Sequence, residues 1–323
     1  MDSDQADQVP AFPAARGSRL PWRDLPDRIR RAVERQLGSR VERARDQPGG
    51  FSPGVAARLV LADGRRAFVK AVSASPNAES PQMHRREARI AAGLPGEAPV
   101  PRFLFAVDDG DWVALAFEDV EGRHPRLPWR EDDLQRVLRA LTDLSHALTP
   151  SPVEASPLSE QFDEQFRGWR ELAAAPAGQT SSIDPWARQN LARLAALEAG
   201  WASAGEGETL LHADLRADNI LLGEDRVFFI DWPHACRGAP WVDLLFLLPS
   251  VSMQRGPEPW TVFDEHPLGR TAQPGRVDAV LAAAAGFLVW RGSQPPPPGL
   301  PTLREFQRAQ GAEALAWLCR RLG

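Results

Sequence analysis

Two short apolar runs near the middle of the chain constrain its fold more than any other feature. Residues 220–222 and 227–230 are joined by Gly-Glu-Asp-Arg, the pattern of two buried strands connected by a polar turn. A hairpin folds its ends back together, so Asn219 before the first run and Asp231 after the second become neighbours. Asp214 lies on the loop just before the hairpin. The sequence therefore predicts that three oxygen-bearing side chains converge on one site.

These side chains have the chemistry that phosphoryl transfer from a nucleotide requires. One carboxylate takes or orients the proton of an attacking hydroxyl, while an amide oxygen and a second carboxylate hold Mg²⁺ on the phosphates. The alternative is a surface loop with ordinary polar residues. We favour the site, because the flanking apolar runs place Asp214, Asn219 and Asp231 at strand ends rather than at random.

The same stretch carries a family pattern. Residues 212–219 spell HADLRADN, and Ile-Asp-Trp follows at 230–232. The pattern HxDxxxxN plus IDW resembles the aminoglycoside phosphotransferase and choline kinase family, which shares the protein kinase fold. The resemblance extends over roughly residues 45–250 and is weaker in the C-terminal helices. It implies an α+β, two-lobed fold, with an antiparallel sheet in a small N-lobe and a larger, mostly helical C-lobe.

The resemblance also implies roles for individual residues. Asp214 corresponds to the catalytic base, and Asn219 and Asp231 to the Mg²⁺ ligands, with ATP or GTP as co-substrate. His212 is expected to pack and hydrogen-bond beneath the loop. Arg216 departs from the family pattern, since many members carry His there, and it could contact the transferred phosphate or equally be a surface Arg.

A lysine upstream fits the same scheme. Lys70 ends an apolar stretch in a predicted strand that follows an Asp-Gly turn at 63–64, and a Lys inside a buried strand is costly unless it is paired. The resemblance implies that Lys70 contacts the nucleotide phosphates and pairs with Glu87 on the next helix, which ends near Gly93. A Lys at the sheet edge and a Glu on a solvated helix face are the alternatives.

Two further segments complete the nucleotide site that the resemblance implies. Glycines at 48–54, including Gly50, can present backbone N–H groups to phosphate oxygens, and Ser52 can add a hydroxyl. The backbone at Glu118 and Val120 corresponds to the hinge that binds the adenine edge. A plain hairpin turn and an ordinary strand end are the respective alternatives.

The position of Asp243 indicates both a structural role for this acid and the size of the acceptor. Asp243 lies in an apolar helix, where a carboxylate needs hydrogen-bond donors, and the resemblance implies that it holds the backbone of the catalytic loop. Asp243 follows Asp231 by only twelve positions. Protein kinases insert a long activation segment there, so a small-molecule hydroxyl acceptor fits better than a peptide.

Composition limits the other classes of function. The 323 residues carry a net charge of −5 and are 43% hydrophobic, which fits a two-lobed globular enzyme and disfavours nucleic acid as a partner. We expect no membrane span, because no run of 18 apolar residues occurs, and an acidic, polar N-terminus indicates a cytoplasmic protein. Two cysteines make neither a disulfide scaffold nor a metal site. A monomer or a homodimer is expected.

Periodicity and composition divide the chain. We predict a flexible tail at 1–20, a nucleotide-binding N-lobe at 21–121, and a C-lobe at 122–323 with the catalytic loop and the acceptor-binding helices. Apolar spacing predicts helices at 25–37, 131–148, 161–174, 187–202, 276–290 and 303–322.

Acceptor contacts are harder to assign from the sequence. Trp260, Trp290 and Trp317 are expected in the core rather than in an aromatic box for a quaternary amine. Five acids could face a cationic substrate, although most are expected to be solvated: Glu160, Asp163, Glu164, Asp264 and Glu265.

The favoured hypothesis is a Mg²⁺-dependent kinase of a small hydroxylated molecule, either aminoglycoside-like, an amino alcohol or a sugar. A nucleotide-binding protein without catalysis and a protein kinase are the alternatives. The shared residues of the family serve the nucleotide rather than the acceptor, so antibiotic resistance is one option among several.

Overall fold

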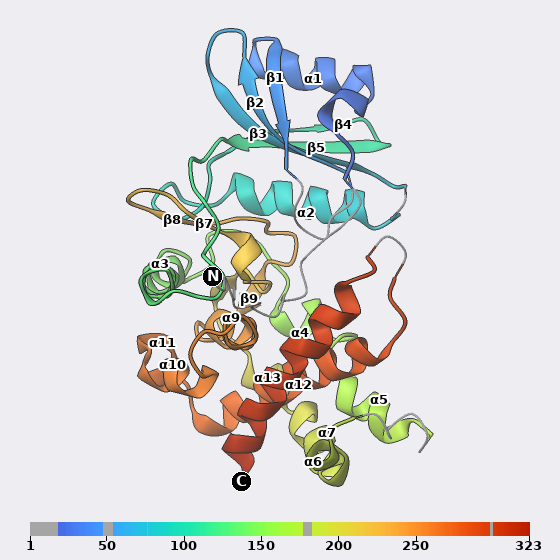
Figure 1. Cartoon of the computed structure of the whole chain (residues 1–323), viewed down its shortest axis with the longest axis vertical. Coiled ribbons are helices and arrows are strands. Elements are labelled where there is room, and N and C mark those ends of the chain that lie inside the picture. The colour runs from blue at the N-terminus through green and yellow to red at the C-terminus, as the bar shows by residue number, and fades with distance from the viewer. Residues whose placement is uncertain (1–18, 48–53, 76, 177–182, 298–299) are drawn as a thin grey trace, which may run out of the picture.

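A sheet-containing N-terminal part lies above a larger helical part (Figure 1). This arrangement confirms the predicted α+β, two-lobed fold, whereas the lobe boundary at residue 121 stays a prediction. The computed structural model describes residues 19–47, 54–75, 77–176, 183–297 and 300–323.

The N-terminal part is a five-stranded antiparallel sheet in the order β1-β2-β3-β5-β4. Helix α1 packs on one face and helix α2 on the other. The predicted helix at 25–37 is therefore α1. The elements are η1 (Trp22–Asp24), α1 (Asp27–Leu37), β1 (Val41–Asp46), β2 (Val55–Leu61), β3 (Arg66–Ser73), α2 (Ser80–Ala92), β4 (Phe103–Asp108) and β5 (Trp112–Glu118).

Side-chain alternation along β3 determines where Lys70 points. Ala67, Val69 and Ala71 are buried in the apolar cluster that includes α1, whereas Phe68 packs with the α2 side of the sheet. Because successive side chains of a strand point to opposite faces, Lys70 lies on the same face as Phe68. The strand thus directs the lysine toward α2.

The C-terminal part is mainly helical and contains two short two-stranded sheets, β6–β9 and β7–β8. In the described residues, no helix is both long and apolar enough to cross a membrane. The elements are α3 (Glu131–Ala147), α4 (Leu158–Gln161), α5 (Gly168–Ala174), α6 (Pro185–Gln189), α7 (Leu191–Ala199), α8 (Trp201–Ala204), β6 (Thr209–Leu211), η2 (Ala217–Asn219), β7 (Ile220–Leu222), β8 (Val227–Phe229), β9 (Cys236–Gly238), α9 (Val242–Met253), α10 (Pro259–Glu265), α11 (Pro267–Arg270), α12 (Pro274–Ser293) and α13 (Leu303–Leu322).

Two predicted helices are broken in the structure. The segment 161–174 is not one helix, because α4 ends at Gln161 and α5 begins only at Gly168. The segment 187–202 is divided among α6, α7 and α8, with a break at Gly200. Glycine is a poor residue for a helix interior, and tertiary packing decides where these short helices end.

A close contact between α5 and α12 leads to a stability prediction. A Cβ added at Gly168 would lie 1.9 Å from the carbonyl oxygen of Gly286 on α12, so Gly168→Ala has to push the helices apart. We expect the free energy of unfolding, measured by urea denaturation, to fall by about 1–3 kcal/mol. Gly275→Ala is the matched control, since nothing lies within 4 Å of its added Cβ. Equal stability of the two variants would show that the contact does not constrain the packing.

Candidate active site

A largely buried lysine, with a side chain 12% exposed, joins the N-terminal sheet to the helical part. Lys70 Nζ on β3 lies 2.5 Å from Glu87 Oε2 on α2 and 2.5 Å from Asp231 Oδ1 just beyond β8. The backbone N–H of Trp232 donates to Glu87 Oε1 at 3.2 Å. Glu87 therefore ties the lysine and the segment after β8 to the same helix.

The protonation of this cluster follows from burial and charge. Burial alone lowers the pKa of Lys70, but the carboxylates of Asp231 and Glu87 outweigh it, so the pKa is raised. Burial raises the pKa of Glu87 even though Lys70 opposes the shift. Burial is the largest single effect on Asp231 and raises its pKa, but the charge and hydrogen bond of Lys70, with contributions from His84 and His212, together hold the pKa of Asp231 well below its usual range. Lys70 and Asp231 are thus both charged at neutral pH.

The β7–β8 hairpin brings Asn219 beside Asp214 and Asp231. Ile220 pairs with Phe229, and the N–H of Ile230 donates to the Asn219 carbonyl at 2.9 Å. The Asn219 side-chain nitrogen donates to the Asp214 carbonyl at 2.8 Å and lies 3.4 Å from the Asp214 carboxylate. This pairing confirms the predicted hairpin and the predicted convergence of its two ends.

Asp243 and His212 support the loop that carries Asp214. The Asp243 carboxylate accepts from the backbone N–H groups of His212 and Ala213, each at 2.8 Å. His212 is fully buried, and its Nε2 lies 2.8 Å from the Ile230 carbonyl oxygen. Ala213 has a φ of 62°, a left-handed conformation that is uncommon for a residue with a Cβ. The two hydrogen bonds to Asp243 hold this turn in place, as expected for Asp243.

Arg216 is paired with both neighbouring acids. Its Nη1 donates to Asp214, and its Nε and Nη2 donate to Asp218 at 3.1 and 3.2 Å. The carboxylates of Asp214 and Asp218 more than offset burial, so the pKa of Arg216 is raised. Arg216 is therefore a permanently charged group next to Asp214, and not a solvated surface arginine.

Sequence comparison identifies the family to which this arrangement belongs. A family model described as "Phosphotransferase enzyme family" matches residues 47–278, well over half of the chain. The chain belongs to this family. The match includes Lys70, Glu87, Asp214 and both residues at the ends of the hairpin. A search of curated proteins gave no match for this phosphotransferase.

Solved structures show the same fold at low sequence identity. A thermostable mutant of aminoglycoside phosphotransferase APH(4)-Ia, with AMP-PNP and hygromycin B, is 14% identical with a TM-score of 0.59, covering 92% of this chain and 99% of its own. Choline kinase LicA from Streptococcus pneumoniae is 13% identical with a TM-score of 0.57, and the match covers 90% of this chain and 100% of the choline kinase. Amicoumacin kinase hAmiN, with AMP-PNP and Ca²⁺, is 13% identical with a TM-score of 0.54, and the match covers 88% of this chain and 93% of the amicoumacin kinase.

The structure describes only some of the other residues predicted to bind the nucleotide. Gly50 and Ser52 lie outside the described residues, between strands β1 and β2. Glu118 ends β5, and its N–H donates to the Arg102 carbonyl at 2.9 Å, so a nucleotide would have to use the Glu118 carbonyl instead. Val120 follows in the segment that connects the two parts of the phosphotransferase.

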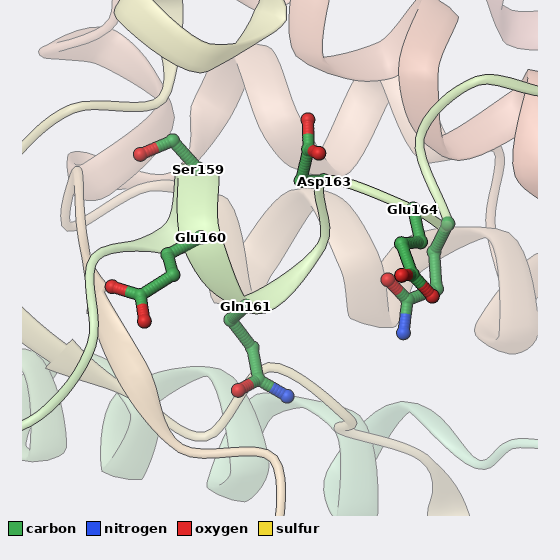
Figure 2. A pocket seen from close by; sticks show the side chains of 6 residues that line it. Ser159, Glu160, Gln161, Asp163 and Glu164 are labelled. Atoms are coloured by element: carbon green, nitrogen blue, oxygen red, sulfur yellow. The ribbon is translucent and has the colours of Figure 1, made fainter.

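The predicted acceptor acids do not form one group. Ser159, Glu160, Gln161, Asp163 and Glu164 line a hollow of about 500 Å³ along the connection from α4 to α5, with Gln165 (Figure 2). Asp264 and Glu265 are exposed at the end of α10, which packs with α9 and α11. The two sets come from separate parts of the helical region.

The three tryptophans do not form an aromatic box. Trp317 is fully buried and packs against Phe263, with 5.2 Å between ring centroids. Trp260 and Trp290 are partly buried against the same core, and the Arg320 guanidinium lies over Trp260. The expectation that these residues serve the core is confirmed.

Sequence reasoning missed His84 and a group of phenylalanines near Asp214. His84 lies on the inner face of α2, one turn before Glu87, and is buried. Helical spacing puts it on the same side of the helix as Glu87, and this spacing could have found it. The phenylalanines come from three segments far apart in the chain, and no local signal brings them together.

Because His84 is buried, we predict that the folded protein loses stability in mild acid. Burial and the nearby Lys70 lower its pKa from 6.5 to about 3, so the unfolded chain binds this proton at a higher pH than the folded chain does. His84 therefore contributes stability above pH 6.5 that is lost as the pH falls toward 3. We expect His84→Gln to flatten the decline in unfolding free energy between about pH 7 and about pH 4.5, measured by urea denaturation.

Exposed His146 on α3 provides the control. His146→Gln should keep the wild-type slope over the same range. A His84→Gln protein with an unchanged slope would show that other groups control acid stability.

Proposed function

We propose that this phosphotransferase transfers the γ-phosphate of ATP or GTP to a hydroxyl of a small molecule in a Mg²⁺-dependent reaction. The observation that carries the proposal is the convergence of Lys70, Asp214, Asn219 and Asp231 from three separate segments, since Asp214 and Asn219 share one loop. Each supplies a function that phosphoryl transfer needs, and the reaction depends mainly on positioning and charge stabilisation.

Asp214 is the proposed base. Its carboxylate lies at the end of a turn fixed by Asp243, and it is about one-third exposed. An acceptor hydroxyl next to Asp214 could give up its proton to the carboxylate as the bond to phosphorus forms. Arg216 donates a hydrogen bond to the same carboxylate, and we propose it as a contact of the transferred phosphate.

Asn219 and Asp231 fit the requirements of a Mg²⁺ site. The Asn219 side-chain nitrogen is hydrogen-bonded to Asp214, which leaves its amide oxygen as the group to face a cation. Asp231 adds a carboxylate with a lowered pKa. Such hard oxygen ligands, one or two from protein and the rest from phosphates and water, suit Mg²⁺. When bound, the ion would neutralise charge on the phosphates.

Lys70 and the predicted nucleotide segments complete the proposal. Lys70 would neutralise α- and β-phosphate oxygens while Glu87 fixes its position. We place the phosphates against Gly50 and Ser52, and the base edge against the backbone of Glu118 and Val120.

The short connection after Asp231 supports a small acceptor. Strand β9 lies within this connection and pairs with β6, and α9 begins at Val242. A peptide-binding activation segment has no room in so few residues. Aminoglycoside-like molecules, amino alcohols and sugars are the acceptor classes to compare.

The proposal is tested by nucleotide binding and turnover together. Mg-ATP or Mg-GTP should raise the thermal midpoint, since a ligand at about 100 times its Kd stabilises by about 2.7 kcal/mol. EDTA or Asp231→Asn should remove ADP or GDP formation while the fold persists. Binding without any turnover over the whole acceptor panel would favour a non-catalytic nucleotide-binding protein.

A further inference from the structure

A second hollow opens directly beside Asp214. It measures about 90 Å³, well above the roughly 15 Å³ that a single water molecule occupies. Asp214 and Arg216 form its polar wall, and Gln310 on α13 also lines it. A molecule seated here would place a hydroxyl next to the proposed base.

The remaining wall is largely aromatic, and we call this space the phenylalanine hollow. Phe162 stacks on Phe166 with 4.9 Å between ring centroids, and both rings contact Phe246 edge-on at 6.0 and 5.9 Å. Phe287 on α12 lies 6.1 Å from Phe166. Phe162, Phe246 and Phe287 remain partly exposed. Covering these rings with an apolar ligand would stabilise the complex by roughly 25 cal/mol per Å² of apolar surface removed from water.

The charged groups of this wall do not favour a cation. The charges of Asp214 and Arg216 are opposite and already paired. An ammonium group that entered among the phenylalanines would lose its hydration, which is costly because the Asp214 carboxylate in the wall is already paired with Arg216. Arg216 would also repel it.

The acids of α4 and of the α4–α5 connection face a different hollow. Glu160, Asp163 and Glu164 line the space shown in Figure 2, and Asp163 also pairs with Arg167. Phe162 and Phe166 from the same connection line the space beside Asp214. These acids and phenylalanines thus face different hollows, and Asp214 lies with the phenylalanines.

We propose that the acceptor is an uncharged alcohol whose apolar ring or chain fills the phenylalanine hollow, with its hydroxyl directed at Asp214. This inference rests on the proposed function and narrows it to one acceptor class. A polycationic amino sugar, with an ammonium group next to its reacting hydroxyl, is disfavoured.

A matched pair of probes tests the inference on the whole chain with Mg²⁺ and AMP-PNP bound. Cyclohexylmethanol carries the hydroxyl on an apolar ring, and 4-(aminomethyl)cyclohexylmethanol adds one ammonium. Ligand-observed NMR titration should give at least about tenfold tighter binding of the uncharged probe, because the ammonium loses its hydration. Equal or tighter binding of the amine, or no binding of the uncharged probe up to its solubility, would overturn the inference.

Variants of the lining residues test whether cyclohexylmethanol binds in the phenylalanine hollow. Phe246→Ala should weaken cyclohexylmethanol about tenfold, the loss expected for roughly 1.4 kcal/mol of apolar contact. Phe105→Ala, which truncates a partly buried ring on β4, should leave the affinity unchanged. Phe287→Leu serves as a milder second variant if Phe246→Ala does not fold. Unchanged affinity in a folded Phe246 or Phe287 variant counts against the proposed site.

The two proposals fail in different ways. If the protein binds no Mg-nucleotide and forms no ADP, the phosphotransferase chemistry itself is wrong. If nucleotide binding and turnover are present but the amine probe is preferred, only the acceptor class is wrong.

Discussion

Asp214→Asn is expected to lower kcat by about 10²–10⁴-fold, the usual contribution of a general base. Asparagine keeps the shape of the side chain but cannot take a proton. The hydrogen bond from Asn219 to the Asp214 backbone carbonyl is unaffected by the change, and Arg216 keeps its two hydrogen bonds to Asp218. The loop should therefore retain its geometry, and the affinity for Mg-nucleotide should change by less than about threefold, or about 0.7 kcal/mol.

The measurement combines initial rates of ADP formation with a thermal-shift titration of Mg-ATP. Asp225→Asn, on the exposed turn of the same hairpin, is the matched control and should behave as wild type. Undiminished phosphorylation by the Asp214→Asn protein would exclude Asp214 as the base. A parallel loss of nucleotide affinity would instead indicate that Asp214 organises the nucleotide site.

Local patterns were sufficient to predict the centre of the site. The β7–β8 hairpin could be recognised because both strands and the turn lie within a dozen residues, and pairing its ends places Asn219 beside Asp231. Lys70 was predictable for a similar reason, since a charged residue inside an apolar strand requires a partner. The family resemblance implied a glutamate partner on the next helix, with Glu87 as the candidate, and the structure shows that it lies 2.5 Å from the lysine.

Non-local packing limited the remaining predictions. The predicted helix at 161–174 is interrupted, and α5 begins only at Gly168, which packs closely on Gly286 of α12, a contact between segments more than a hundred residues apart. The phenylalanine hollow also depends on contacts between segments that lie far apart in the chain. Helix α9 is apolar almost all round, so its sequence does not reveal that Phe246 is partly exposed beside Asp214.

Asp243→Ala is expected to reduce both stability and activity. The substitution leaves the N–H groups of His212 and Ala213 buried without their acceptor, at a cost of about 1–3 kcal/mol for each group. The free energy of unfolding should fall by about 2–5 kcal/mol. The left-handed turn at Ala213 loses its support as well, so Asp214 should move, and a displacement of about 1 Å can cost roughly 10²-fold in kcat.

Two further variants separate the effect of the hydrogen bonds from that of charge. Asp243→Asn keeps one acceptor oxygen for the two N–H groups, so its stability and activity should lie between those of the wild type and the alanine variant. Asp264→Ala removes an exposed acid from α10 and should leave the free energy of unfolding within about 0.5 kcal/mol of wild type. Urea denaturation measures all three variants. If Asp243→Ala were as stable as Asp264→Ala, the loop would hold its turn without the carboxylate, and the position of Asp214 would need another explanation.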